Sequence, residues 1–289
     1  MVNKDLIHLL QMRRRVVLKR IQYFIKRNIQ AWTHEERMII NEGPRVLANS
    51  TPKAGTNLLL NALQAMPNTV DRWSYHIDET LPGVEKQLRA SRRGQIISSH
   101  LPWSQSIAKL CYDLNYRLLL IVRDPRDIAI SNVNYVTRMD FSHPLHRIMA
   151  SLPDDDTRLL NMIDPSDELL EKLPNIWKNY GLSTFLPWLD EPNCLIVRFE
   201  DLVGERGGGS DELQRNAIRE IANHIGADVN QSFIDSIASG LFGNTGSKTF
   251  HTGQIGNWRS HFKSMHIKAF KSHSNQALLR LGYEQVLDW

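Results

Sequence analysis

The residues best suited to bind a phosphate group lie in one short segment, residues 49–57. The segment contains Lys53 and Gly55, and it stands between two apolar runs, 46–48 and 58–60. This pattern predicts a strand, a tight turn and the start of a helix, an arrangement that binds phosphate through backbone N–H groups and a lysine. In a Walker A loop the lysine follows the last glycine. Because Lys53 precedes Gly55, we expect a phosphorylated donor other than ATP with magnesium.

A second group of candidate ligands begins where the most apolar stretch of the chain, residues 116–122 (YRLLLIV), ends. This stretch predicts a strand that is buried on both faces. Arg123 follows it, and Pro125 is typical of the first turn of a helix. Ser131 would lie about two turns along that helix, so Arg123 and Ser131 are candidates to bind one phosphate. The alternative is a capped helix start whose charges form only local ion pairs.

A histidine follows the predicted strand at 95–99. Pro102 holds Leu101 in an extended conformation, so His100 stays at the end of the strand. A neutral imidazole in this place could accept a proton from a hydroxyl group of a substrate. The alternative is a structural histidine, and Glu79 is then the next candidate base.

A polar loop with two glycines, residues 248–259, precedes the last predicted helix. Backbone N–H groups near Gly253 are candidates to bind a second anion. Asn257 and Trp258 are typical of the cap and first turn of a helix. The alternative is a loop that is closed by a packed tryptophan.

The elements that must position these residues alternate along the chain. Strands are predicted at 45–48, 95–99, 116–122 and 194–199. Helical patterns separate them, which indicates a parallel sheet with helices on both faces. We therefore expect a single α/β domain over residues 44–289, with a P-loop-like sheet of about five strands flanked by helices. Since ligands bind at the carboxyl ends of the strands in such sheets, the candidate residues should share one edge.

Glycines and prolines divide the rest of the chain. Amphipathic helices are predicted at 212–225 and 267–281, and each ends at a glycine. Residues 151–172 and 204–210 are expected to form mobile loops, because their composition shows no regular periodicity.

The first 43 residues are predicted to form a basic, amphipathic helical segment. Apolar residues recur at helical spacing within 3–32, and no acidic residue lies between Asp5 and Glu35. Such a helix could lie on an anionic membrane or dock on a partner. The alternative is a helix packed on the domain.

The composition is that of an ordinary globular protein, with 42% hydrophobic and 23% charged residues in a chain of 289. The net charge of +4 suits an anionic ligand, a nucleic acid or an anionic surface. Cys111 and Cys194 are expected to be buried, reduced thiols, and no Cys or His spacing indicates a metal site. No apolar run reaches the roughly 18 residues that span a bilayer, and no signal peptide is recognised, so we expect a cytoplasmic protein.

Four of these segments together resemble the sulfotransferases that use 3′-phosphoadenosine 5′-phosphosulfate (PAPS), particularly the soluble, cytosolic-type family. The segments are residues 52–57 (PKAGTN), 99–102 (SHLP), 123–131 (RDPRDIAIS) and 251–259 (HTGQIGNWR). One such segment would be a weak signal, but four in the family's order and spacing, over roughly residues 44–262, are specific.

The resemblance implies a metal-independent, in-line transfer of a sulfuryl group from PAPS, which leaves adenosine 3′,5′-bisphosphate (PAP). Its implied catalytic residues are Lys53, His100 and Ser131. Lys53 would offset charge on the leaving oxygen, and His100 would be the general base. Arg123 and Ser131 would hold the 3′-phosphate. The other residues implied at the donor are Ala54, Gly55, Thr56, Asn57, Leu58, His251, Thr252 and Gly253.

Two departures from the family pattern concern the adenosine end of the donor. Leu58 stands where an aromatic residue usually stacks on adenine. His251 and Thr252 stand where an Arg-Lys pair usually contacts the 3′-phosphate. Each charge-assisted contact is worth about 1.5–3 kcal/mol, so we expect Arg259, Lys248 or another residue to compensate.

The implied acceptor is a hydroxyl or amine group on a small molecule or glycan, and no nucleic acid or defined oligomeric state is implied. Residues 3–32 add a candidate peripheral contact with a membrane. Aromatic candidates for the wall of the acceptor pocket are Trp73, Tyr75, His76, Trp103, Tyr135 and Phe141. Two other functions stay open. One is a non-catalytic PAP- or nucleotide-binding scaffold docked through its basic helix, and the other is a P-loop kinase, which the position of Lys53 disfavours.

Overall fold

The computed structural model describes residues 30–77, 83–166, 182–242 and 253–289. Its centre is a five-stranded sheet with the strand order β2-β3-β1-β4-β5, and all neighbouring strands are parallel. The strands are β1 (Arg45–Ser50), β2 (Tyr75–His76), β3 (Ile96–Ser99), β4 (Tyr116–Val122) and β5 (Cys194–Arg198). The predicted α/β class, with its parallel sheet of about five strands, is confirmed.

The register of the sheet brings three strand ends to the same level. Asn49 of β1 pairs with Ser99 of β3, and Ser50 pairs with Ile121 of β4. Each of these residues stands at or next to the carboxyl end of its strand. The turn after β1, the residue after β3 and the residue after β4 therefore emerge along one edge.

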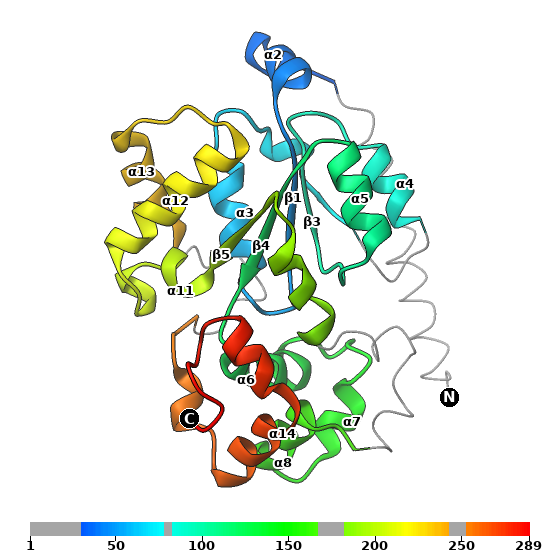
Figure 1. The fold of residues 1–289 in the computed structure, drawn as a ribbon, viewed down its shortest axis with the longest axis vertical. Helices are drawn as coiled ribbons and strands as arrows, with labels where there is room; N and C mark the ends of the chain where they lie inside the picture. The colour runs from blue at the N-terminus through cyan, green and yellow to red at the C-terminus, as the bar shows by residue number, and fades with distance from the viewer. Residues whose placement is uncertain (1–29, 78–82, 167–181, 243–252) are drawn as a thin grey trace, which may run out of the picture.

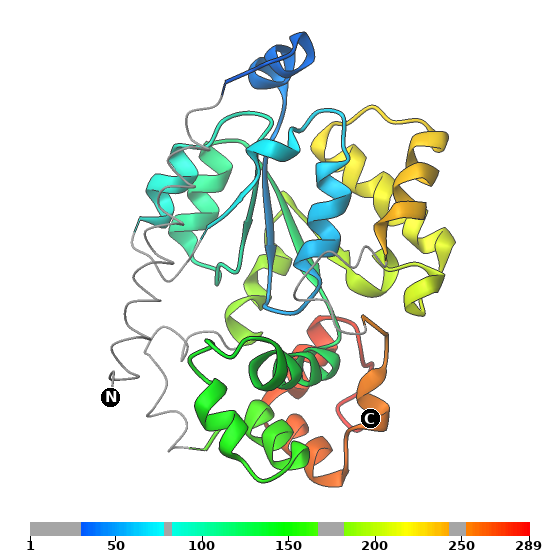
Figure 2. The same ribbon diagram turned by 180° about the vertical axis from the view of Figure 1, so that it is seen from behind.

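Helices cover both faces of the sheet (Figures 1 and 2). One face carries α3 (Thr56–Gln64), α11 (Phe199–Leu202), α12 (Asp211–Ile225) and α13 (Gln231–Leu241). The other carries α4 (Val84–Arg89), α5 (Gln105–Asp113), η3 (Leu182–Thr184) and η4 (Leu186–Asp190). Each face has its own apolar core, with Leu59 and Ile221 in the first and Leu118 and Trp188 in the second. This two-sided burial explains the continuous apolar run of β4.

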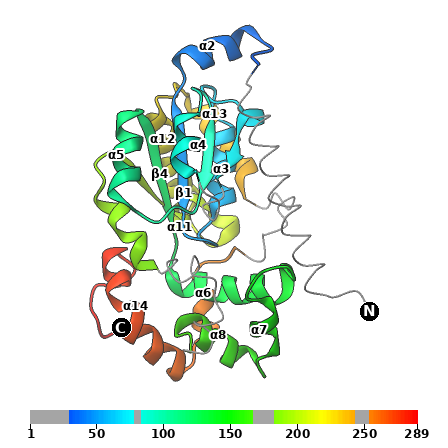
Figure 3. The same ribbon diagram turned by 90° about the vertical axis from the view of Figure 1, so that its right-hand side faces the viewer.

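A further layer of helices closes the carboxyl edge of the sheet (Figure 3). It contains α6 (Pro125–Asn134), η2 (Tyr135–Met139), α7 (His146–Ser151), α8 (Asp155–Ile163), η6 (Asn257–Ser260) and α14 (Ser264–Arg280). A third apolar cluster holds the layer together, and it includes Val136, Met149, Leu159 and Trp258. The layer is therefore built from segments that are far apart in the sequence.

The prediction of an irregular loop over 151–172 was wrong in its described part, because α8 occupies Asp155–Ile163. Asp154 caps this helix by accepting a hydrogen bond from the backbone of Thr157 at 2.7 Å. Leu159 is buried on its inner face. The series of aspartates that follows Pro153 is therefore a helix start, although Pro and Asp are also typical of turns.

Other local predictions needed smaller corrections. The strand predicted to end at Phe199 ends at Arg198, and Phe199 begins α11. The predicted loop 204–210 contains the 3-10 helix η5 (Glu205–Gly207). The predicted helices at 212–225 and 267–281 are present, as α12 and α14. The two-residue β2 was not predicted, since a strand this short has no readable alternation.

The described chain begins with an isolated helix, α2 (His34–Glu42), at the top of Figure 1. No residue of α2 is buried. The helix is connected to the domain by Arg72, whose Nε and Nη2 donate hydrogen bonds to the two carboxylate oxygens of Glu36. The predicted basic helix within 3–32 lies almost wholly outside the described residues. Of the helices that can be described, none is long and apolar enough to cross a membrane.

Candidate active site

The turn between β1 and α3 is built for close approach of a ligand to the backbone. Gly55 has φ +108°, and a Cβ at this position would lie 2.6 Å from the Phe199 ring, so only glycine fits. Lys53 also has a positive φ, of 69°. Among the described residues, no side chain caps the amino end of α3, which starts at Thr56. The first turn of α3 is therefore suited to bind an anion.

Lys53 and Arg123 place two positive charges beside this turn. Arg123 is 7% exposed, and its Nη1 donates to the carbonyl of Lys53 at 3.4 Å. Burial, together with the charge of Arg123, lowers the pKa of Lys53 to about 8. Burial also lowers the pKa of Arg123, although Asp127 and Glu200 oppose this shift. An anion at this point would relieve the unfavourable burial of both cations.

Arg123 also reaches the C-terminal loop. Its Nη2 donates to the carbonyl of Gln254 at 3.0 Å, and its guanidinium lies over the Phe199 ring, 4.4 Å from the centroid. Arg123 Nε is buried and has no hydrogen-bond partner in the described part of the chain. A buried guanidinium N–H without a partner is rare and marks a place where a phosphate oxygen would fit.

Asp127 fixes the loop that Arg123 touches. Its carboxylate accepts the N–H groups of Gly256 at 2.7 Å and Trp258 at 2.8 Å. Gly256 caps η6 with φ 71°, so the cap is this glycine and not Asn257, as the sequence had suggested. Asp127 is 1% exposed, which makes it a buried link between α6 and the C-terminal loop.

Local ion pairs at the start of α6, the alternative considered for this segment, are present as well. Asp124 caps the helix, and its two carboxylate oxygens accept hydrogen bonds from Nε and Nη2 of Arg126. The Arg126 guanidinium also lies over the rings of Trp258, at 3.9 Å, and Trp289, at 4.5 Å. The segment 123–131 therefore contains both the candidate phosphate ligand and the local ion pairs. Arg123 faces the turn, while Arg126 packs against the two tryptophans.

His100 lies on the opposite side of the same turn. Its Nδ1 is 2.9 Å from the carbonyl oxygen of Ser50, and this oxygen can only accept. Nδ1 is therefore the donor to this oxygen, and in the neutral imidazole the lone pair lies on Nε2. The Ser50 hydroxyl lies 3.1 Å from the same Nδ1 and 2.6 Å from the Thr56 hydroxyl. His76, from β2, contacts the His100 ring edge to face, with centroids 5.3 Å apart.

The other predicted site residues differ in burial, and some of them lie outside the described part of the chain. Ser131 lies about two turns into α6, as predicted, and is half-buried. Ala54 is fully buried, and Asn57 is exposed at the start of α3. Leu58 is 8% exposed and packs in the core, so its side chain belongs to the fold. Gly253 has φ 60°. His251, Thr252, Lys248 and Glu79 lie outside the described residues.

Two of the aromatic residues considered for the acceptor wall can be assigned from their contacts. Trp73 is 2% exposed and packs against Gly94, which precedes β3, so it lies at the other end of the sheet. Tyr135 lies beside the turn, with its ring centroid 4.2 Å from Lys53 Nζ. Its contact with Lys53, like the anchoring roles of Asp127 and Gln254, joins residues far apart in sequence, which no local pattern could reveal.

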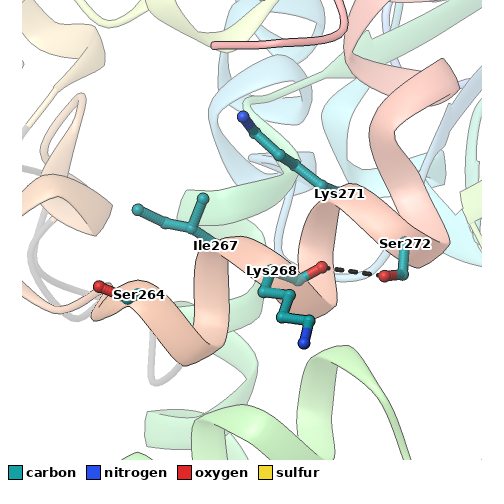
Figure 4. Close-up of a pocket in the computed structure, with 5 residues that line it drawn as sticks. All are labelled: Ser264, Ile267, Lys268, Lys271 and Ser272. Carbon is teal, nitrogen blue, oxygen red and sulfur yellow. Dashed lines mark hydrogen bonds between the residues drawn. The ribbon is translucent and has the colours of Figure 1, made fainter.

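A separate, open pocket of about 500 Å³ lies on the surface of α14 (Figure 4). Its lining is Ser264, Ile267, Lys268, Lys271 and Ser272, all from this one helix. The Ser272 hydroxyl donates to the carbonyl of Lys268 at 3.0 Å. None of these residues belongs to the site beside Lys53.

The sequence model of the sulfotransferase domain matches residues 43–282. This chain belongs to the sulfotransferase domain family. The match confirms the predicted family and the predicted class of enzyme, a sulfotransferase. No curated protein matches the sequence.

Solved structures of sulfotransferases share the fold at low sequence identity. The structure of mouse sulfotransferase SULT7A1 complexed with PAP matches with a TM-score of 0.55 and 16% identity, over 84% of this chain and 88% of that one. Retinol dehydratase in complex with androsterone and PAP gives a TM-score of 0.49 and 17% identity, over 83% of each chain. At this identity the likeness to SULT7A1 supports the fold.

Proposed function

We propose that the enzyme transfers a sulfuryl group from PAPS to a hydroxyl or amine group of a small-molecule or glycan acceptor, with Lys53 and His100 at the reaction centre. The single observation that carries this proposal is the position of Arg123. Its guanidinium contacts the Lys53 turn and the Gln254 loop, and its buried Nε has no partner among the described residues. A phosphate at this point would join three of the four family segments.

The donor would lie along the turn. Backbone groups of Ala54, Gly55, Thr56 and Asn57 would surround the 5′-phosphosulfate at the uncapped start of α3. Arg123 and Ser131 would hold the 3′-phosphate, together with the C-terminal segment of His251, Thr252 and Gly253. Leu58 is buried, so its side chain would support the adenosine end only through the packing of α3.

His100 is oriented to act as the base. Because the Ser50 carbonyl fixes the proton on Nδ1, Nε2 is free to accept the proton of the acceptor. The acceptor oxygen or nitrogen then forms a bond to sulfur, while the bond between sulfur and the bridging oxygen breaks. Lys53 offsets the negative charge that develops on this oxygen.

Transfer of radiolabelled sulfur from PAPS to a panel of alcohols, phenols, amines and glycans tests the proposal. Lys53→Ala and His100→Ala should each abolish transfer, while circular dichroism shows an intact fold. Lys109→Ala and His261→Ala are matched controls, since both residues are exposed and lie on other elements. These controls should keep wild-type rates.

Two other results would contradict the proposal. Tight binding of PAP without transfer to any acceptor or to water would support the non-catalytic scaffold. Full activity of His100→Ala would remove His100 from the role of base and make Glu79 the next candidate.

The cellular setting is a further part of the proposal. Cys111 and Cys194 are free thiols, and burial raises the pKa of each to about 12. Unpaired, unreactive thiols suit a reducing compartment, which supports a cytoplasmic enzyme. We further propose that residues 3–32 contact a membrane surface, on the basis of their charge and apolar period.

A further inference from the structure

Tyr135 is the first residue of a π-helical turn, η2, at the end of α6. The backbone N–H of Asp140 donates to the carbonyl of Tyr135 at 2.9 Å, which closes a turn one residue wider than that of an α-helix. Short π-helical turns of this kind are rare and are frequently found at functional sites. Here the wider turn ends α6 with an aromatic side chain beside the Lys53 turn.

The face of the Tyr135 ring is directed at Lys53. Lys53 Nζ lies 4.2 Å from the ring centroid, within the range of a cation–π contact. Lys53 comes from the turn after β1, and Tyr135 comes from the end of α6. The contact therefore joins the sheet to the helical layer that closes its edge.

Two neighbours hold the ring in this orientation. The phenol O–H donates to Asp140 Oδ2 at 3.1 Å, and the His143 ring packs edge to face at 6.0 Å. Asp140 is itself fixed, because its Oδ1 accepts from the backbone N–H and the hydroxyl of Ser142. The ring is thus held by one hydrogen bond and by one contact with another ring.

We propose that Tyr135 is a positioning residue that holds the Lys53 ammonium beside the donor turn before the donor binds. The inference rests on the proposed role of Lys53 and deepens it. A ring face attracts the charged ammonium but not the neutral amine. It therefore opposes the effect of burial and of Arg123, which both lower the pKa of Lys53.

The site gives this contact a chemical purpose. Partial burial and the nearby charge of Arg123 both disfavour the ammonium form of Lys53. The ring supplies a weak attraction without a negative charge, so it does not compete with the donor for Lys53 as a carboxylate would. Lys53 can then exchange the ring for the leaving oxygen when the donor arrives.

The proton affinity of Lys53 tests the proposal without any transfer assay. The rate of acylation of Lys53 by an amine-reactive reagent follows the unprotonated amine, and mass spectrometry of the Lys53 peptide reports it across pH. Tyr135→Phe loses the hydrogen bond to Asp140 but keeps the ring and its contact with His143, so it should titrate as the wild type does. Tyr135→Leu and Tyr135→Met remove the ring but stay apolar, and whichever of them folds should shift the titration down by about 0.4–1.5 pH units.

The kinetics of sulfuryl transfer provide a second test of the role of Tyr135. In the folded ring-deleted variant, the alkaline limb of the pH profile of kcat/KM should move down by the same amount, and in Tyr135→Phe it should not move. Tyr112→Leu is the matched control, since Tyr112 is 73% exposed on α5. In a Lys53→Arg background, loss of the ring should no longer move the limb, because arginine stays charged.

The outcomes separate this proposal from the function on which it rests. An unchanged Lys53 titration in a folded ring-deleted variant overturns the role of Tyr135, whatever the activity. A shifted titration with undiminished transfer by Lys53→Ala keeps the Tyr135 contact but rejects Lys53 as the catalytic cation. A simple packing role predicts lower stability with both pH profiles unchanged.

Discussion

The carboxylate of Asp127 binds the backbone nitrogen of Trp258 at 2.8 Å, although the two residues lie 131 positions apart in the chain. Its other oxygen accepts the N–H of Gly256. Asp127 belongs to the helix that follows Arg123, and the loop that it holds carries the Gln254 carbonyl contacted by Arg123. One buried carboxylate therefore joins the two parts of the proposed 3′-phosphate site.

Asp127→Asn should weaken the binding of PAP. The amide keeps one acceptor oxygen but turns an NH₂ group toward a backbone N–H, so one of the two hydrogen bonds is lost. A hydrogen bond to a charged group is worth about 1.5–3 kcal/mol, which corresponds to roughly 10- to 150-fold in affinity. Calorimetric titration with PAP measures the change.

Asp211→Asn is the matched control for this prediction. Asp211 also accepts a backbone N–H, that of Glu205 at 3.0 Å, but it lies at the start of α12. The control should bind PAP as the wild type does. Equal affinities for the Asp127 variant and the control would show that the loop does not depend on Asp127.

Trp289→Ala should lower the stability of the helical layer. Trp289 packs on Trp258 and Phe270, lies over Arg126, and donates from Nε1 to Asn275 Oδ1 at 2.7 Å. Because the residue is only partly buried, we expect a loss of about 2–3 kcal/mol, at or below the 3–5 kcal/mol typical of a core aromatic. Urea unfolding measures this loss of stability.

Tyr112→Ala, at an exposed site, is the control and should change stability by less than about 0.5 kcal/mol. A similar loss in both variants would contradict the role of Trp289 in the helical layer.

The affinity for PAP should fall as the pH rises above 8. The pKa of Lys53 is lowered to about 8, so the ammonium is present below this pH and is lost above it. The phosphates of PAP are already ionised above about pH 7, so the change comes from the protein. The affinity should fall by about twofold between pH 7 and 8, and then by up to about tenfold per pH unit.

Lys53→Arg isolates this titration, because arginine stays charged throughout the range. Its affinity for PAP should not depend on pH between 7 and 9.5. An equally steep fall in this variant would mean that another group titrates.

The sequence predicted those parts of the site whose signal is local. The apolar run of β4, the order of Lys53 and Gly55, and Pro125 after Arg123 each lie in one short segment. They located the ends of β1 and β4, and His100 before Pro102 located the end of β3. The register of the three strands places these ends on one edge. The position of the donor turn was therefore accessible before the structure was known.

The contacts that hold the site together depend on tertiary packing. Asp127 with Trp258, Arg123 with Gln254 and Lys53 with Tyr135 each join segments that are distant in the chain. Trp73 shows the opposite error: the sequence makes it a candidate for the wall of the acceptor pocket, but the residue is part of the core. Helix α8 was not predicted because Pro153 and the aspartates after it are typical of a turn as well as of a helix start.

Discrimination of the 3′-phosphate tests the central claim most directly. The measurement is the ratio of affinities for PAP and for adenosine 5′-phosphate, which lacks the 3′-phosphate, in the wild type and in Arg123→Ala. The account predicts a strong preference for PAP in the wild type that falls by roughly 10- to 150-fold in the variant, as expected for a lost charged hydrogen bond. An unchanged ratio in a folded Arg123→Ala variant would contradict the account, because the 3′-phosphate would then bind elsewhere.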